Sequence, residues 1–235
     1  ALGNYSLYNN TTASNNTAVG YQAGYSTTGT GNTLTGYYAG QTLTTGNYNC
    51  FFGRNSGGLS SGITGDYNNG FGNGSLSSLT SGTQNDAHGT GAASGLSSGS
   101  FNVAMGTNAL LTTSSGSYNV AIGTAALQQN TTANSNTAVG YQALYNNLSY
   151  NNTAIGHQAG YTAAGADSNQ HVYVGYQAGY SNQQGIANTF VGYRAGYYSN
   201  PGTTATGINT FVGYQAGLSV TTGVQNTFIG SASVT

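Results

Sequence analysis

One short motif recurs along this chain, and its spacing limits the fold more than any other feature of the sequence. A glycine follows a short apolar run, as in Asn-Thr-Ala-Val-Gly, from the first residues to the last. This anchoring glycine occurs at Gly3, Gly20, Gly36, Gly53, Gly72, Gly89, Gly106, Gly123, Gly140, Gly156, Gly175, Gly192, Gly213 and Gly230. Neighbouring anchoring glycines are 16 to 21 residues apart, and 17 is the commonest spacing. A period of this length indicates a repeat architecture that continues over residues 1–235 as a single domain.

Other columns keep the same register as the anchoring glycine. The residue one before it is usually Val, Ile, Met or Phe, and the residue three after it is always Ala or Ser. The residue four before it is asparagine in almost every repeat, and His171 is the exception. The asparagines predicted to form a structural ladder are Asn16, Asn32, Asn49, Asn119, Asn136, Asn152, Asn188, Asn209 and Asn226.

The repeat length and composition favour strands over helices. A pair of helices needs about 30 residues, and this repeat is rich in Gly, Thr and Asn, which form helices poorly. The Asn-Thr-Ala-Val-Gly segment alternates and carries β-branched residues, which indicates a strand, and the Gly-, Ser- and Thr-rich stretches between such segments indicate turns. The sequence therefore predicts an all-β parallel β-solenoid of about fourteen coils of 16 to 21 residues, with coils stacked about 4.8 Å apart.

The columns have physical roles in such a stack. An inward asparagine can bond to the asparagine of the next coil through its side-chain amide. We expect the Val and Ile column to fill a narrow core, and the anchoring glycine to allow a bend or a positive φ. In residues 53–101, Gly and Ser replace larger side chains, so we expect thinner and more mobile coils there, or else a local bend or a binding loop.

The middle residue of each strand suggests self-association. It is small in many repeats and aromatic near the C-terminus. Because side chains alternate along a strand, it points opposite to the Val or Ile that follows it, and both faces of the strand are then apolar. A thin solenoid has one interior, so we expect the second apolar face to meet another copy of the chain. The residues predicted to mediate self-association are Ala18, Ala121, Phe190, Phe211 and Phe228.

Charge patterning excludes several classes of function. Charged residues are 2% of the chain and the formal net charge is −1, whereas roughly a quarter of residues are charged in typical soluble domains. Two isolated arginines, Arg54 and Arg194, cannot supply the cluster of cations that binds nucleic acid. No apolar run reaches the roughly 20 residues of a membrane span, so we expect no membrane insertion.

The sequence offers no residue set typical of catalysis or metal binding. His88, His157 and His171 occupy different repeats and different columns, and each replaces a residue that is normally Val, Tyr or Asn. The aspartates are scattered in or beside predicted turns, too sparse for a calcium site; they are Asp66, Asp86 and Asp167. We therefore predict no enzyme activity, no cofactor and no metal site.

Tyrosine directly follows the anchoring glycine in several repeats. One interpretation is structural, a stacked aromatic spine that stiffens the coils. The other is functional, an exposed strip that binds sugars or surfaces, because tyrosine offers a large contact area and keeps a hydroxyl group. The candidate surface-binding residues are Tyr21, Tyr141, Tyr176, Tyr193 and Tyr214.

Two runs carry a resemblance to a known family. Asn136 to Ala143 reads Asn-Thr-Ala-Val-Gly-x-x-Ala, and Asn119 to Ala126 reads Asn-Val-Ala-Ile-Gly-x-x-Ala. Both resemble the head repeat of YadA-like trimeric autotransporter adhesins, which has the form Ser-Val-Ala-Ile-Gly-x-x-Ser, and similar repeats occur in repeat-rich phage-type tail-fibre proteins. The resemblance covers nearly the whole chain. It implies a left-handed parallel β-roll, three chains around one axis and an extracellular adhesive or receptor-binding role.

We therefore expect a non-enzymatic extracellular fibre, the shaft or head of a surface adhesin or phage-type tail fibre. It would associate as a homotrimer or filament and attach to a cell-surface or carbohydrate receptor. A purely structural self-assembling filament is one alternative. An ice-binding β-solenoid is another, because threonines form a column at Thr17, Thr33, Thr137, Thr153, Thr189, Thr210 and Thr227. We disfavour ice binding because this column accepts Val103, Val120 and Val172 and shares its face with the Val and Ile expected in the core.

Overall fold

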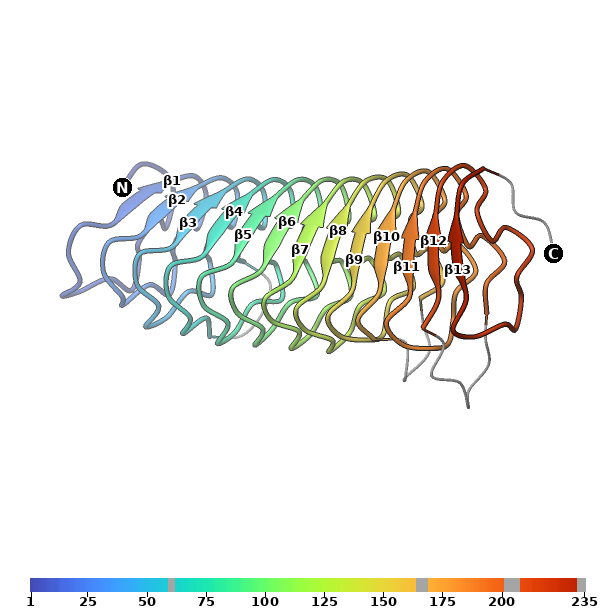
Figure 1. Ribbon diagram of the computed structural model, residues 1–235. Coiled ribbons are helices and arrows are strands. Elements are labelled where there is room, and N and C mark those ends of the chain that lie inside the picture. Colours follow the sequence, from blue (N-terminus) through green and yellow to red (C-terminus); the bar gives the residue numbers. More distant parts are fainter. Residues whose placement is uncertain (59–61, 164–168, 201–207, 232–235) are drawn as a thin grey trace. The chain divides into compact units, whose positions relative to one another are not determined.

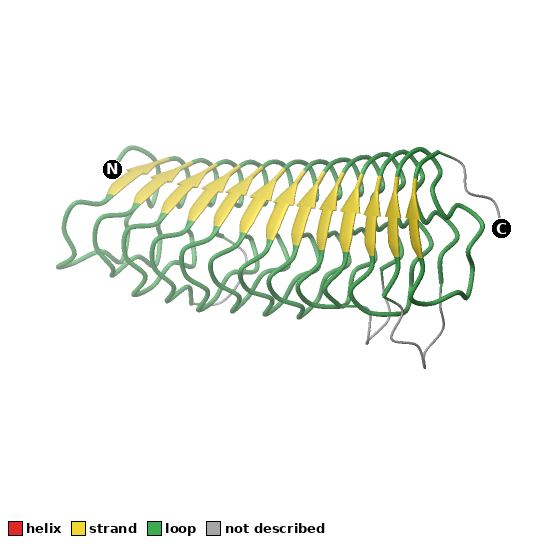
Figure 2. Ribbon diagram, viewed as in Figure 1, coloured by secondary structure: helices red, strands yellow, loops and turns green. Residues whose placement is uncertain are grey.

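The computed structural model describes residues 1–58, 62–163, 169–200 and 208–231. The chain divides into two compact units, unit 1 (Ala1–Tyr118) and unit 2 (Asn119–Thr235), where the repeat alone suggested one domain. Both units are parallel β-solenoids, and no helix occurs among the described residues (Figure 2). The predicted all-β solenoid is thus confirmed, with about 12 turns in the two units together.

Each turn contributes one strand of three residues, and each strand pairs in parallel with the next strand along the chain within its unit (Figure 1). Unit 1 contains β1 (Thr17–Val19), β2 (Thr33–Thr35), β3 (Cys50–Phe52), β4 (Asn69–Phe71), β5 (Asp86–His88) and β6 (Val103–Met105). Unit 2 contains β7 (Val120–Ile122), β8 (Thr137–Val139), β9 (Thr153–Ile155), β10 (Val172–Val174), β11 (Thr189–Val191), β12 (Thr210–Val212) and β13 (Thr227–Ile229). The register aligns equivalent residues, so that Ala138 pairs with Ala154 and Val139 with Ile155.

The anchoring glycines end the strands in a conformation that other residues rarely adopt. Their φ angles lie between +128° and +138°, as the bend expected at this column requires. A side chain is also excluded by the neighbouring turn, since a Cβ on Gly156 would lie 2.7 Å from the carbonyl carbon of Gly175. Both constraints recur from turn to turn, so glycine is required at this column for two independent reasons.

The direction of the strand side chains differs from the prediction for the Val and Ile column. Val19, Ile122 and Ile155 are 38%, 37% and 44% exposed, so this column faces outward instead of filling the core. The strand-centre residue, such as Ala154, is fully buried. The physical reason is the alternation of the strand. Asn152 and Ala154 are two residues apart and therefore share the inward side, which leaves Thr153 and Ile155 outward.

The core keeps its volume in most turns through an exchange of sizes between two positions. One is the strand centre, and the other, here called the turn position, is the fourth residue after the anchoring glycine. In the turn of β8, Ala138 is combined with Leu144, both fully buried. In the turn of β11, Phe190 is combined with Gly196, whose Cβ would lie 2.5 Å from the phenyl ring. The two positions therefore fill one common space.

The Gly- and Ser-rich segment 53–101 follows the same plan. It contains β4 and β5, and its strand centres are small, Gly70 and Ala87. Leu76, Leu79 and Leu96 are fully buried and fill the interior from the turn side. The coil thus persists through this segment, of which residues 59–61 lie outside the described residues. Its greater mobility stays a prediction.

Candidate functional site

The asparagine column forms a ladder of amide hydrogen bonds inside unit 1. The Nδ2 atom of Asn32 donates to Oδ1 of Asn16 at 3.2 Å, and Asn49 donates to Asn32 at 3.3 Å. The backbone N–H of Asn49 also donates to Oδ1 of Asn32 at 2.8 Å, and Nδ2 of Asn49 reaches the carbonyl of Gly65 at 2.9 Å. Each amide therefore joins successive turns while its own polar atoms are satisfied, which is the condition for burying it.

In unit 2 the ladder continues through Asn119, Asn136, Asn152, Asn188, Asn209 and Asn226 but is interrupted by histidine. Asn136 donates to Asn119 at 3.3 Å and Asn226 to Asn209 at 3.2 Å. Between them, the buried Nδ1 of His171 takes the acceptor role and receives the backbone N–H of Asn188 at 3.0 Å. Burial lowers the pKa of His171 to about 4. A backbone hydrogen bond with Gly185 acts in the opposite direction but is the smaller effect. His171 therefore serves the ladder as a neutral imidazole.

The residues predicted to mediate self-association do not face outward. Ala18, Ala121, Phe190 and Phe211 are all fully buried within their own turns, so their assignment to an association surface is wrong. Phe190 stacks on Phe211 at 4.9 Å between ring centroids, and Phe211 stacks on Phe228 at 5.1 Å. These rings form an internal aromatic stack because the strand centre shares the inward side with the asparagine ladder.

The surface that alternation leaves available is the opposite face of the same strands. In unit 2 it is formed by the first and last residues of β7 to β13, here called the outward sheet face. Its members are Val120, Ile122, Thr137, Val139, Thr153, Ile155, Val172, Val174, Thr189, Val191, Thr210, Val212, Thr227 and Ile229. Every one is β-branched and every one is partly or largely exposed. Its last-residue column is Val or Ile in every strand from β7 to β13, and exposed apolar surface that is continuous in this way marks an interaction site more often than scattered apolar residues do.

The corresponding face of unit 1 is mixed in chemistry. Asn69 of β4 donates to the Asp86 carboxylate of β5 at 2.5 Å. His88 stacks on Phe71 at 4.6 Å. Cys50 begins β3 half-buried, and burial raises the pKa of its thiol. These polar groups interrupt the β-branched surface, so the uninterrupted outward sheet face is a property of unit 2.

The tyrosines that follow the anchoring glycine are both stacked and exposed. Tyr21 is 38% exposed and stacks on Tyr37 at 5.6 Å in unit 1. In unit 2, an exposed row runs through Tyr141, His157, Tyr176, Tyr193 and Tyr214, with centroid separations of 5.1 to 5.2 Å. Neighbouring rings cover much of each ring face, so the row presents mainly ring edges and hydroxyl groups to solvent.

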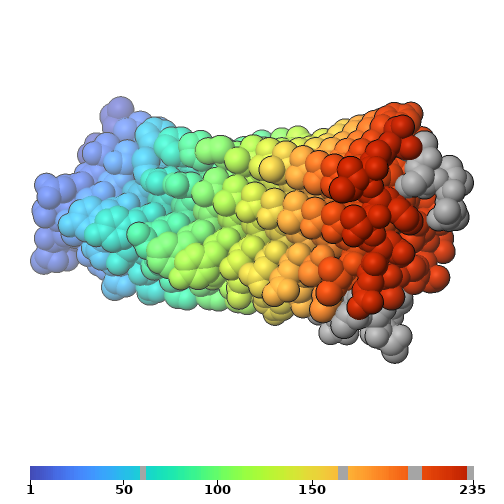
Figure 3. All heavy atoms as spheres, in the orientation of Figure 1, coloured from blue at the N-terminus to red at the C-terminus, as the bar shows by residue number. Residues whose placement is uncertain are grey.

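A second aromatic row and an amide row run parallel to the first in unit 2, and the space-filling view shows how side chains of successive turns gather in rows (Figure 3). The second aromatic row comprises Tyr145, Tyr161, Tyr180 and Tyr197, stacked at 5.0 to 5.1 Å. The amide row is linked by side-chain hydrogen bonds of 2.9 to 3.0 Å; it comprises Gln142, Gln158, Gln177 and Arg194. The guanidinium of Arg194 lies 5.4 Å and 5.2 Å from the Tyr193 and Tyr197 ring centroids, between the two aromatic rows.

The three histidines occupy different columns of the stack. His88 lies on the outward side of β5, His157 in the exposed aromatic row and His171 in the buried ladder. Asp66 accepts the backbone N–H of Asn47 at 2.7 Å, and Asp167 lies outside the described residues. Within the described ranges, no group of three or more His, Cys, Asp or Glu side chains is close enough to hold a metal ion.

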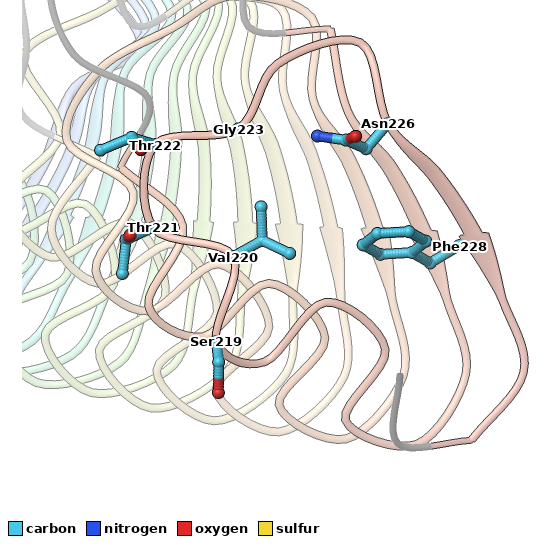
Figure 4. Close-up of a pocket in the computed structure, with 7 residues that line it drawn as sticks. All are labelled: Ser219, Val220, Thr221, Thr222, Gly223, Asn226 and Phe228. Atoms are coloured by element: carbon cyan, nitrogen blue, oxygen red, sulfur yellow. The ribbon is translucent and has the colours of Figure 1, made fainter. Parts of the chain in front are cut away.

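One hollow of about 280 Å³ lies in the last described turn of unit 2. Figure 4 shows Val220 and Phe228 pointing toward one another across its interior, with Asn226 beside them. In earlier turns these positions are closed by the next turn, as the full burial of Phe211 shows. The hollow is thus the interior of a turn without a described turn beyond it, and we assign it no ligand.

Comparisons with known proteins do not place the chain in a family. No protein-family model, curated protein or solved structure matches it. Within the part of the chain that the structure describes, there is no helix of the length and apolarity needed to cross a membrane.

Proposed function

We propose that this chain is a non-enzymatic module of an extracellular fibre, the shaft or head of a surface adhesin or phage-type tail fibre that mediates attachment. Copies of the chain associate through the outward sheet face of unit 2, in a trimer. The resemblance to YadA-like and tail-fibre repeats supports the choice of attachment and the extracellular location. The association surface is inferred from the exposure and chemistry of the residues on the outward sheet face.

The observation that carries the proposal is the uninterrupted outward sheet face. Two β-branched columns run along seven successive strands, and Ile155 is 44% exposed there. Burying this surface against a second copy would remove apolar area from water at about 25 cal/mol per Å². No charge on this face opposes the contact, whereas Asp86 and His88 of unit 1 lie on the equivalent side of β5. A second copy, which carries the same uncharged face, is therefore the best-matched partner.

The catalytic alternative has little support. The histidines and the described aspartates sit in separate columns, and their hydrogen bonds and ring contacts serve the stack. An acid–base or nucleophilic mechanism needs convergent groups beside a substrate pocket. The side chains of this chain instead repeat the same contacts from turn to turn.

Light scattering on the purified chain tests the association surface. The mass of three chains is expected for the natural protein, and of one chain for Ile155→Glu and Val191→Glu, which place charges on the outward sheet face. Tyr198→Glu is the matched control, because Tyr198 is exposed on a turn away from that face and its replacement should leave the mass unchanged. A natural chain that stays monomeric at high concentration would contradict the proposal.

Electron micrographs of the native material separate attachment from a purely structural filament. Short fibres of defined length that end in a tip are expected for an adhesin or tail fibre. Unbroken filaments of one repeating subunit would instead favour the structural alternative, in which the chain has no receptor.

Ice binding is a second candidate because of one specific observation. The threonine column was expected to share its face with core residues, but Thr153 and Ile155 both face outward. In-register strands place these groups at a regular separation of about 4.8 Å, as a match to a crystal surface requires. Inhibition of ice growth by the chain, lost in Thr153→Lys, would favour this candidate over self-association.

A further inference from the structure

A groove on the turns of unit 2 has a surface chemistry different from that of the outward sheet face. Its volume is about 460 Å³, within the range of ligand sites. It is lined by Gln129, Thr131, Asn146, Leu148, Thr162 and Gln183. None of these residues carries a charge, and none belongs to a strand.

The lining residues come from four successive turns, so the groove runs along the stacking direction. Gln129 and Thr131 follow β7, Asn146 and Leu148 follow β8, Thr162 follows β9 and Gln183 follows β10. Backbone hydrogen bonds between turns hold this wall in place. The N–H of Gln129 donates to the carbonyl of Tyr145 at 2.9 Å, and that of Asn146 donates to Tyr161 at 3.0 Å. Equivalent backbone positions therefore recur about 4.8 Å apart along the groove and carry different uncharged side chains.

The second aromatic row makes this wall rigid. Tyr145 precedes Asn146 in the chain, and Tyr161 precedes Thr162. The two tyrosine rings stack at 5.1 Å with an interplanar angle of 8°. A wall that is ordered before binding loses less conformational entropy when a ligand arrives, which raises the affinity available from few contacts.

Three side-chain amides of the groove are available to a ligand, whereas the Thr162 hydroxyl donates to the carbonyl of Tyr180 at 2.7 Å. The side-chain amides of Gln129, Asn146 and Gln183 form no hydrogen bonds with the described residues. Each amide offers two donors and an acceptor, and Leu148, which is 48% exposed, adds an apolar contact between them. A purely apolar ligand would bury these amides without partners, which costs free energy. An anionic polymer would find no cation in the groove.

We infer that unit 2 binds a neutral, extended polysaccharide along this groove, with successive sugar rings lying over successive turns. The hydroxyl groups of a sugar match the amides as donors and acceptors, and its C–H face matches Leu148. The repeat of an extended sugar chain is about as long as the separation between turns, so successive sugar rings can meet the side chains of successive turns. This inference rests on the proposed attachment function and names the class of receptor.

Calorimetric titration with neutral, linear glucose, mannose and N-acetylglucosamine oligomers of increasing length tests the inference. Binding is expected for at least one series, with affinity that rises with length until the oligomer covers the four turns that line the groove. Asn146→Ala and Gln129→Ala are each expected to weaken binding about tenfold, the effect of one well-formed pair of hydrogen bonds.

Gln225→Ala is the matched control. Gln225 is an exposed amide of unit 2 that does not line the groove, and its column accepts alanine at Ala187 with a similar φ of 53°. Circular dichroism should show the same fold in all three variants. Absence of binding by every neutral series, binding unchanged in the Asn146→Ala and Gln129→Ala double variant, or equal binding of uronic-acid oligomers would overturn the inference.

The same samples separate this inference from the fibre proposal. Trimers that bind none of the oligomers would overturn the polysaccharide site alone and leave the assembly proposal standing. Monomers that bind the oligomers in the groove would overturn the assembly proposal and keep the site.

Discussion

In unit 2, the turns of β7 and β8 carry alanine at the strand centre and leucine at the turn position, whereas the turns of β10 to β12 carry an aromatic ring and glycine. Ala121 is combined with Leu127, while Phe211 is combined with Gly217. The asparagine ladder and the anchoring glycines are present in both groups. The backbone of this solenoid is therefore the same whether the large side chain comes from the strand centre or from the turn position. In both groups, one large side chain from either position fills the interior of the turn.

The turn of β9, which lies between the two groups, is filled by side chains of its neighbours. Ala154 and Gly160 are both small, so this turn does not fill its own interior. The ring of Tyr173 from the following turn and the side chain of Leu144 from the preceding one reach Gly160, where a Cβ would lie 2.5 Å and 2.9 Å from them. Packing is thus shared between neighbouring turns, as in other stacked repeat proteins.

The most direct test places the large residues of both arrangements, the aromatic ring and the leucine, in one turn. Gly196→Leu should lose about 3 kcal/mol because the leucine would overlap the Phe190 ring. Phe190→Ala should lose about 4 kcal/mol through a cavity. The double variant should be more stable than either single variant, since it recreates the pair Ala138 and Leu144, where leucine adopts a φ of 48°. Chemical denaturation of the four proteins measures this coupling, and additive losses would refute a common space.

The second test concerns the ladder of the aromatic group, where His171 replaces asparagine. A free histidine has a pKa of about 6.5, whereas burial lowers the pKa of His171 to about 4. Between these values the unfolded chain binds a proton that the folded chain does not, so stability falls as the pH falls from 6.5 to 4. The expected loss is about 3 kcal/mol, and full stability is present above pH 6.5.

His171→Asn restores the residue of the other turns and should remove most of this pH dependence. Denaturation midpoints across the pH range compare the two proteins. An equal slope in both proteins would show that His171 does not cause the loss.

A smaller effect is expected from the hydroxyl group of Tyr173. This ring occupies the place of Phe190 and Phe211, and its buried hydroxyl has no hydrogen-bond partner among the described residues. Tyr173→Phe should therefore stabilise the chain by about 2 kcal/mol. Phe211→Tyr is the matched reverse change and should destabilise by a similar amount. Thermal denaturation measures both, and a destabilised Tyr173→Phe would show that the hydroxyl is satisfied in solution.

The smallest effect is expected on the outside of the same turns. Tyr180 stacks on both Tyr161 and Tyr197 at 5.0 Å, yet the turn of β7 has Gln128 at this position and keeps the same backbone. Tyr180→Gln should cost about 1 kcal/mol, the value of exposed ring contacts. A loss as large as that of Phe190→Ala would mean that the exposed row is as necessary for the fold as the internal stack.

The sequence predicts those features that depend on residue identity within one column. The strand at Thr153–Ile155, the inward Asn152 and the bend at Gly156 all follow from recurrence at a fixed position. The Val and Ile column was predicted to fill the core, which was wrong, although the alternation of side chains along the strand could have shown this. Asn152 and Ala154 are two residues apart, so an inward asparagine already requires an inward alanine.

Other features depend on how separate columns meet in space. The exchange of sizes between Ala138 and Leu144, or Phe190 and Gly196, is written in the sequence, but only the path of the turn brings each pair together. The groove lined by Gln129 and Asn146 could not be predicted for the same reason. Polar residues in turns are common, and a concave arrangement of them depends on backbone angles that composition does not specify.

The contact between successive anchoring glycines also bears on how such a gene can change. Each turn meets mainly its two neighbours, and the junction at Gly140 against Gly156 has the same geometry as that at Gly156 against Gly175. Recombination between similar coding segments that adds or removes one whole repeat would join equivalent surfaces and leave every remaining junction intact. A change that replaces an anchoring glycine would instead bring a Cβ against a glycine carbonyl, whereas the spacings of 16 to 21 residues show that the turns accommodate small differences in length. Natural variants should therefore gain or lose whole repeats, or a few residues within a turn, and keep every remaining anchoring glycine.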